Sequence, residues 1–202
     1  MRLFLTLLTL SSLAAASPAP SVEIERENQL VEFLNSRPAS AADNETALQR
    51  QKRLRRIARA VVEVAAEEQT RKWLPRTAAT AAVLTIWYYE SRFSRTVHAG
   101  GLTQWGSDRG KAKCMGQLHA GLWLPEAQWA SLVGTDLEST KRCARATLTR
   151  FRMAAGACGW RWGSAKGWAG AFRNYAGASC DKPIPTEKKR VNLALKLAYW
   201  LK

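Results

Sequence analysis

Histidine is scarce in this chain, and the common metal and nucleotide motifs are missing. The two histidines, His98 and His119, have no partner residue at the spacing of a metal site. The four cysteines form no C-x-x-C pair, which gives no support to a zinc site or a dithiol redox motif. No G-x-S-x-G, P-loop or H-E-x-x-H motif occurs. We therefore expect neither a metal ion nor a cofactor.

Acidic residues are also few. Asp and Glu total 16 against 31 Lys and Arg, which gives a formal charge of +15. An excess of this size is larger than solubility needs and is typical of a protein with an anionic partner. The candidates are a cell-wall polymer, a phospholipid surface or a nucleic acid. Six of the basic residues gather within 50–59, either as a solvated helix face or as a dock for a polyanion.

Long apolar runs are absent as well. The run LFLTLLTL at 3–10 is shorter than the about 20 residues of a membrane-spanning helix. It follows Met1-Arg2 and precedes Ala14–Ala16, a small-residue pattern that signal peptidase recognises. This order predicts a signal peptide over residues 1–16, with a buried N-terminal helix as the alternative. We expect an exported protein, periplasmic or extracellular, without a permanent membrane span, and export argues against nucleic acid as the partner.

The even number of cysteines fits an exported, disulfide-bonded chain. Four cysteines allow three pairings. The stretch from Cys143 to about residue 155 is expected to be helical, and a rise of 1.5 Å per residue would hold Cys143 roughly 20 Å from Cys158. That separation exceeds disulfide reach. The favoured pairs are therefore Cys114–Cys143 and Cys158–Cys180.

Helical periodicity dominates the rest of the chain, and no alternating β-branched run is long enough to predict a sheet. The fold class is therefore mostly α. The roughly 186 residues that follow the cleavage site suffice for one well-cored domain with an extension. We expect an N-terminal helical extension over 17–70, a main domain over 71–202, and irregular loops over 91–124. Helices are expected at 22–36, 45–71, 76–90, 126–134, 137–156, 164–177 and 184–202.

One carboxylate lies in an unusual setting, within the stretch TIWYYESRFS at 85–94. Glu90 ends an apolar helix, where the helix dipole and aromatic neighbours both disfavour its ionised form. Arg92 and Arg95 in the following loop would oppose this effect. A carboxyl group that keeps its proton is what protonates a glycosidic oxygen. The sequence thus offers Glu90 as a general acid, with a plain surface glutamate as the alternative.

The residues around Glu90 resemble the Glu-Ser-x-Phe motif of soluble lytic transglycosylases and the related goose-type lysozymes. Glu90 matches the catalytic acid of the family and Ser91 its partner in the motif. The family's Gly-Leu-Met-Gln turn is similar to KCMGQLH at 113–119, where Gln117 matches while Cys114 and Gly116 replace the Gly and the Met.

A third family motif, Ala-Tyr-Asn-x-Gly, is similar to NYAGA at 174–178. Tyr175 matches, but Ala176 replaces the asparagine, whose contacts Asn174 could supply instead. The resemblance covers residues 76 to 200 and implies a lysozyme-like catalytic domain over 71–202. The implied substrate is the β-1,4 bond between N-acetylmuramic acid and N-acetylglucosamine in peptidoglycan.

The implied mechanism is that of a lytic transglycosylase. One glutamate gives a proton and then removes one from the muramoyl 6-hydroxyl, which forms a 1,6-anhydro ring without water. The first alternative is a hydrolytic muramidase, a lysozyme in which Asp108 is the second carboxylate that activates water. The other is a non-catalytic wall-binding protein on the same scaffold.

The remaining expectations concern substrate contacts and partners. Trp105 and Trp123 offer flat faces for sugar rings in the loops after Glu90, and His119 lies two residues beyond Gln117. The expected partners are peptidoglycan glycan strands and anionic wall polymers, bound by a monomer.

Overall fold

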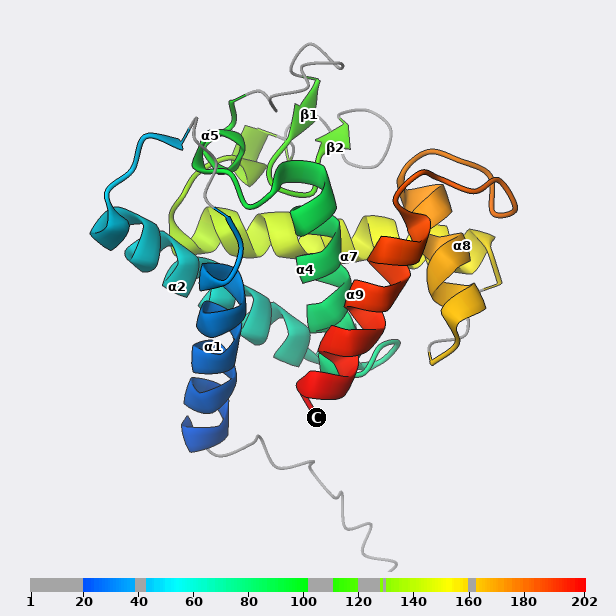
Figure 1. Cartoon of the computed structure of the whole chain (residues 1–202), viewed down its shortest axis with the longest axis horizontal. Coiled ribbons are helices and arrows are strands. Elements are labelled where there is room, and N and C mark those ends of the chain that lie inside the picture. The colour runs from blue at the N-terminus through cyan, green and yellow to red at the C-terminus, as the bar shows by residue number, and fades with distance from the viewer. Residues whose placement is uncertain (1–19, 39–42, 102–110, 120–127, 129, 160–162) are drawn as a thin grey trace, which may run out of the picture.

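The computed structural model describes residues 20–38, 43–101, 111–119, 128, 130–159 and 163–202. The signal-peptide prediction for 1–16 lies outside these ranges. Over the described residues the chain is mostly helical, as expected (Figure 1). Its elements are α1 (Pro20–Asn35), α2 (Ala47–Ala66), α3 (Glu68–Arg71), α4 (Arg76–Ser91), α5 (Arg95–His98), β1 (Ala112–Lys113), β2 (Leu118–His119), η2 (Ala130–Leu132), α7 (Leu137–Ala157), α8 (Ala165–Tyr175) and α9 (Glu187–Trp200).

Helix α4 is the central element. It packs against α9 on one side and against α2 and α7 on the other, and α9 runs antiparallel to it in Figure 1. Its sequence is apolar almost all round, and Trp87 is completely buried. The indole Nε1 of Trp87 donates a hydrogen bond to Thr147 Oγ1 of α7, at 3.0 Å. Such all-round burial is what an apolar helix without a polar face requires.

Helices α1 and α2 belong to the same core as the rest of the chain. Leu30 and Leu34 of α1 and Leu54 and Ile57 of α2 are fully buried within the same hydrophobic cluster as α4. In Figure 1 the two helices lie against the central helices. Helices α1 and α2 are therefore packed into the body of the molecule.

The helix expected over 45–71 is interrupted. Helix α2 ends at Ala66, and the extended ψ of 139° at Glu67 starts the short α3. The side chain of Glu67 pairs with Arg145 of α7, with Arg145 Nη2 2.6 Å from Glu67 Oε1. At the other end, Thr46 and Gln49 form a capping box that begins the helix. Local periodicity does not reveal the ion pair between Glu67 and α7, so the sequence predicts one continuous helix.

One member of the basic cluster on α2 is not on the surface. Arg53 is buried, and its Nη2 lies 2.5 Å from Glu45 Oε1. Its Nη1 donates to the carbonyl oxygen of Phe93 at 2.7 Å. Arg55 and Arg56 remain exposed on the same helix. The solvated basic face is thus narrower than the run of charges indicates.

The segment expected as irregular loops contains regular structure. Besides α5, strands β1 and β2 form an antiparallel hairpin in which Ala112 pairs with His119. In its turn, Cys114 and Gln117 have positive φ values of 55° and 49°. The structure contains the two expected disulfides, Cys114–Cys143 from this turn to α7 and Cys158–Cys180 from the end of α7 to the loop after α8. Two-residue strands are too short to show an alternation of apolar and polar residues in the sequence.

The helix expected over 126–134 and the membrane-spanning potential of the helices can be compared with the described residues only. Of the helix expected over 126–134, the structure shows the 3-10 turn η2 at Ala130–Leu132. Within the ranges given above, no helix has both the length and the apolar character needed to cross a bilayer.

Candidate active site

Glu90 lies in the last turn of α4, where the backbone changes direction abruptly. Arg92 caps the helix with a left-handed φ of 54°, and its N–H donates to the carbonyl oxygen of Tyr88 at 3.1 Å. The next residue, Phe93, also has a positive φ, 55°. Side chains with a Cβ rarely adopt this conformation. Burial of Phe93, whose ring packs edge-on against Phe33 of α1, compensates for the strained turn.

The structure pairs Glu90 with a cation from the other end of the chain. Arg190 Nη1 lies 2.6 Å from Glu90 Oε1, and the two side chains are 8% and 21% exposed. Arg190 is held in place by Thr186, whose Oγ1 accepts from Nε at 2.9 Å. The sequence predicts an apolar setting for Glu90, and the guanidinium of Arg190 beside it differs from that prediction. In the pair Glu90 is the anionic partner, and a role as proton donor requires the pair to open.

Tyr175 of α8 is the second group at the site. It is buried, and its hydroxyl donates to the carbonyl oxygen of Gly116 at 2.7 Å. Burial raises the pKa of Tyr175, and the negative charge of the nearby Glu90 raises it further. Tyr175 therefore lies within electrostatic range of Glu90 and stays a neutral hydrogen-bond donor. It joins α8 to the hairpin turn beside the end of α4.

Close packing at this turn explains a residue that departs from the family pattern. A Cβ at position 116 would lie 2.4 Å from Thr147 Oγ1 and 3.1 Å from the hydroxyl of Tyr175. Gly116 therefore admits no side chain where the resembling motif has methionine. Cys114, which replaces the motif's glycine, adopts the left-handed φ that glycine adopts most easily.

Three of the predicted substrate contacts are engaged in internal hydrogen bonds. Ser91 is buried and donates to Trp87 O at 2.8 Å, one turn back in α4. Gln117 Nε2 donates to Cys114 O at 3.1 Å, within the hairpin turn. Asn174 Oδ1 accepts from Arg150 Nη1 at 3.1 Å. In this structure these three side chains shape the site, and their contact with substrate stays a prediction.

Of the remaining predicted site residues, only His119 lies within the described part of the chain. His119 is half-buried in β2, opposite Ala112. Trp105 and Asp108, and Trp123 with them, lie outside the described residues. The structure thus joins Tyr175 to Gly116 by a hydrogen bond, places Tyr175 within electrostatic range of Glu90, and leaves the loop residues untested.

Sequence reasoning missed two arginines at this site. Arg190 pairs with Glu90, and Arg150 is buried with its guanidinium carbon 5.6 Å from the ring centre of Tyr175. Burial lowers the pKa of Arg150. Both residues lie 60 or more positions from Glu90 in the chain, so no local spacing marks them. The only available signal was the unusual number of arginines.

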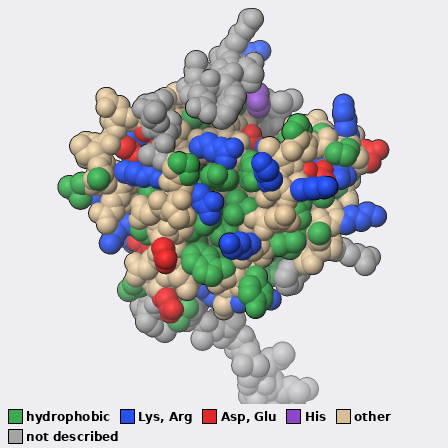
Figure 2. All heavy atoms as spheres, viewed as in Figure 1, with side chains coloured by type: hydrophobic (Ala, Val, Ile, Leu, Met, Phe, Trp, Pro, Cys, Tyr) green, Lys and Arg blue, Asp and Glu red, His purple; other side chains and the backbone are tan. Residues whose placement is uncertain are grey.

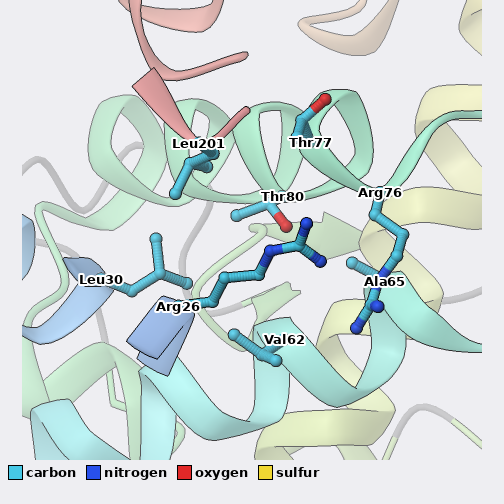
Figure 3. A pocket seen from close by; sticks show the side chains of 8 residues that line it. All are labelled: Arg26, Leu30, Val62, Ala65, Arg76, Thr77, Thr80 and Leu201. Carbon is cyan, nitrogen blue, oxygen red and sulfur yellow. The ribbon is translucent and has the colours of Figure 1, made fainter. Parts of the chain in front are cut away.

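The small cavity in Figure 3 is not part of this site. It lies between α1, α2 and α4 and is lined by Arg26 and Arg76 together with apolar and threonine side chains. Its volume of ≈ 10 Å³ is about that of one water probe, too small for a sugar ring. Within the described ranges, no group of three His, Cys, Asp or Glu side chains is placed to hold a metal ion.

Comparisons with protein-family models, with curated proteins and with solved structures return no match for this chain. The proposed function therefore depends on the geometry and the chemistry of the site.

Proposed function

We propose that this protein cleaves the bond between N-acetylmuramic acid and N-acetylglucosamine in peptidoglycan, as a lytic transglycosylase with Glu90 as its single general acid and base. The supporting observation is the convergence of three sequence motifs that are far apart in the chain. Glu90 lies within electrostatic range of Tyr175, and Tyr175 is hydrogen-bonded to Gly116.

Glu90 acts twice in the proposed reaction. Its carboxyl group gives a proton to the glycosidic oxygen, so that the bond to the muramoyl C1 breaks and the leaving sugar departs with its hydroxyl restored. The resulting carboxylate then takes the proton of the muramoyl 6-hydroxyl, whose oxygen bonds to C1 and closes the 1,6-anhydro ring. The cycle returns the proton to Glu90 and consumes no water, so one carboxylate suffices.

Arg190 orients Glu90 before the substrate binds. Its guanidinium, 2.6 Å from the carboxylate, holds Glu90 in a fixed orientation at the end of α4. In the proposed mechanism the sugar separates the pair when it binds, which frees the carboxyl group of Glu90 to reach the glycosidic oxygen. Arg190 is then a positioning residue.

The test is digestion of purified peptidoglycan by the wild-type chain and by Glu90→Gln, read by mass spectrometry. Anhydro-terminated fragments are expected from the wild type, and the variant should lose about 10²-fold or more of the rate. Glu138→Gln, at an exposed carboxylate on α7, serves as the matched control and should keep full activity. A folded Glu90→Gln chain that releases the same fragments would refute the assignment, and reducing ends would indicate a hydrolase.

The ion pair itself favours one other candidate, a non-catalytic wall-binding protein. A carboxylate neutralised by Arg190 is a structural group unless the pair opens. This candidate predicts sedimentation of the protein with wall fragments, no release of soluble fragments, and equal binding by the wild type and Glu90→Gln.

A further inference from the structure

Three arginines surround the two tyrosines that precede Glu90. The guanidinium carbon of Arg92 lies 4.4 Å from the ring centre of Tyr88, and that of Arg190 lies 5.0 Å from the ring centre of Tyr89. Arg37, which follows α1, lies 4.3 Å from the Phe33 ring and 5.3 Å from Tyr88. These guanidinium groups come from three separate parts of the chain. We call Arg37, Arg92, Arg190, Tyr88 and Tyr89 the arginine–tyrosine cluster.

The cluster has more positive than negative charge. Arg190 is paired with Glu90, whereas no carboxylate of the described residues lies within ion-pair distance of Arg37 or Arg92. The Nε of Arg37 is buried and has no hydrogen-bond partner within the described part of the chain. Arg92 is exposed to solvent. Two guanidinium groups that lie over the ring of Tyr88, two positions before Glu90, therefore have capacity for an anion.

Stacking on aromatic rings does not use the hydrogen-bonding edge of these guanidinium groups. A guanidinium that lies over an aromatic ring uses its flat face, so its N–H groups remain available at the edge. Those edge donors match the two oxygens of a carboxylate in a bidentate pair. The ring contacts also restrict the side chains before a ligand arrives, which reduces the entropy lost on binding.

A groove of ≈ 210 Å³ between α1 and α9 adjoins the cluster through Arg37. Its lining combines apolar and charged side chains, namely Glu32, Phe33, Ser36, Arg37, Leu193, Lys196, Leu197 and Trp200. Figure 2 shows apolar side chains gathered in the middle of this face, with Lys and Arg around them.

Helix α9 connects the groove with Glu90. Arg190, Leu193, Leu197 and Trp200 follow one another at intervals of three and four residues, which places them along one face of the helix. Ten residues of helix from Arg190 to Trp200 span about 15 Å. This face of α9 therefore leads from Arg190, the buried partner of Glu90, to an indole that is 40% exposed.

We propose that the arginine–tyrosine cluster and this groove bind the peptide stem of a peptidoglycan strand, with its carboxylates at Arg37 and Arg92 and its methyl groups against Phe33 and Trp200. The naming of the polymer rests on the proposed function, while the carboxylate site rests on the cluster alone. A stem carries both features that the surface accommodates, negative charge and small apolar side chains. The stem then fixes which muramoyl residue lies at Glu90.

The test measures binding of a probe that the proposed reaction leaves intact. This probe is the disaccharide N-acetylglucosaminyl-N-acetylmuramic acid with a tetrapeptide stem, compared with a disaccharide that has an amide in place of the stem. The proteins are the wild type, Arg37→Gln, Arg92→Gln and the double variant. Arg55→Gln, at an exposed arginine on α2, is the control for charge alone. Calorimetry gives the affinities, and circular dichroism with thermal unfolding confirms the fold.

The stem-bearing probe should bind the wild type more tightly than the amide probe does. Each single variant should weaken it by about fivefold and the double variant by more than tenfold, as expected for lost charge-assisted hydrogen bonds at a partly exposed site. Arg55→Gln should change the affinity less than twofold. Equal binding of the two probes by the wild type, unchanged binding by the double variant, or an equal loss with Arg55→Gln would overturn the proposal. Tighter binding of a phosphate polymer such as teichoic acid would also overturn it.

These outcomes are separable from failure of the proposed function. Loss of stem binding in the double variant without any cleavage by the wild type supports the stem site and rejects the enzyme. Cleavage by the wild type, together with stem binding that is unchanged in the Arg37→Gln and Arg92→Gln double variant, supports the enzyme and rejects the stem site.

Discussion

Glu90 and Arg190 are 2.6 Å apart, although 100 residues separate them in the sequence. The pair links the end of α4 to the first turn of α9. Because the two side chains are only 21% and 8% exposed, neither ion would be well hydrated without the other. The same contact thus contributes to the docking of the last helix and to the orientation of the candidate catalytic group.

Removal of one partner is expected to destabilise the fold more than removal of both. Arg190→Met should lower the free energy of unfolding by about 1–3 kcal/mol, because it leaves a carboxylate partly buried without its cation. The double variant Glu90→Gln with Arg190→Met should recover part of this loss. Urea unfolding measures both, and Lys189→Met, at the exposed neighbouring position, is the control. Additive losses in the double variant would mean that the two groups do not interact.

The hydroxyl of Tyr175 is expected to hold the hairpin turn. Tyr175→Phe leaves the carbonyl oxygen of Gly116 without its 2.7 Å donor in a buried setting, at a cost of about 1–3 kcal/mol. Tyr199→Phe, at a residue that is 78% exposed, should have no measurable effect. Thermal and urea unfolding compare the two. Equal stability of Tyr175→Phe and the wild type would show that this hydrogen bond contributes nothing net.

Two glycines offer a matched test of packing. Gly116→Ala should destabilise the protein by about 1–3 kcal/mol, because the new methyl group meets Thr147 Oγ1 at 2.4 Å. Gly156→Ala should stabilise it by roughly 0.5 kcal/mol, because Gly156 lies within α7 with open space around its Cβ position. Urea midpoints of the two variants should therefore move in opposite directions. A Gly116→Ala chain with wild-type stability would contradict the packing described for the site.

His98 is expected to make the protein sensitive to mild acid. Its side chain is completely buried, and burial lowers its pKa from 6.5 to about 3, with the charges of Arg53 and Arg56 adding to the effect. In the unfolded chain the imidazole takes up a proton below pH 6.5, whereas in the folded chain it does so only near pH 3. The stability contribution is therefore fully present above pH 6.5 and falls as the pH drops from 6.5 toward 3. The loss at pH 5 amounts to about 2 kcal/mol.

The pH dependence can be assigned to His98 by substitution. His98→Gln removes the titrating group and keeps a hydrogen-bonding atom for Thr140 Oγ1, which lies 2.8 Å from Nε2 in the wild type. The variant should be less stable at pH 7.5 but lose less of its remaining stability between pH 7 and pH 5. Urea unfolding across this range gives the slopes, and identical slopes would exclude His98 as the source.

The helices were the most predictable part of the structure. The expectation for 76–90 matches α4 at Arg76–Ser91, and that for 137–156 matches α7 at Leu137–Ala157. Both have a clear apolar pattern, and α7 also has Asp136 as its N-cap. The break at Glu67 and the hairpin at 112–119 were not predictable. The break coincides with an ion pair to a distant helix, which local pattern does not reveal, and two-residue strands carry too little pattern.

The candidate site was predictable only as a set of separate residues. Glu90, Tyr175 and the turn around Gln117 were identified by sequence, but their mutual placement depends on how α4, α8 and the hairpin pack. Arg150 had no local signal, because its role arises from the burial of one arginine among 31 basic residues.

By itself, the order of the amino acids determined the helical class, the central apolar helix, the two cysteine pairs and a carboxylate at a helix end. These features depend on neighbours a few positions apart or on simple reach along the chain. The tertiary structure alone decided that Arg190 neutralises Glu90, that Arg53 is buried, and that Arg37 and Arg92 meet the same tyrosine ring. Those contacts join distant segments, and their geometry exists only once the core has packed and oriented the helices.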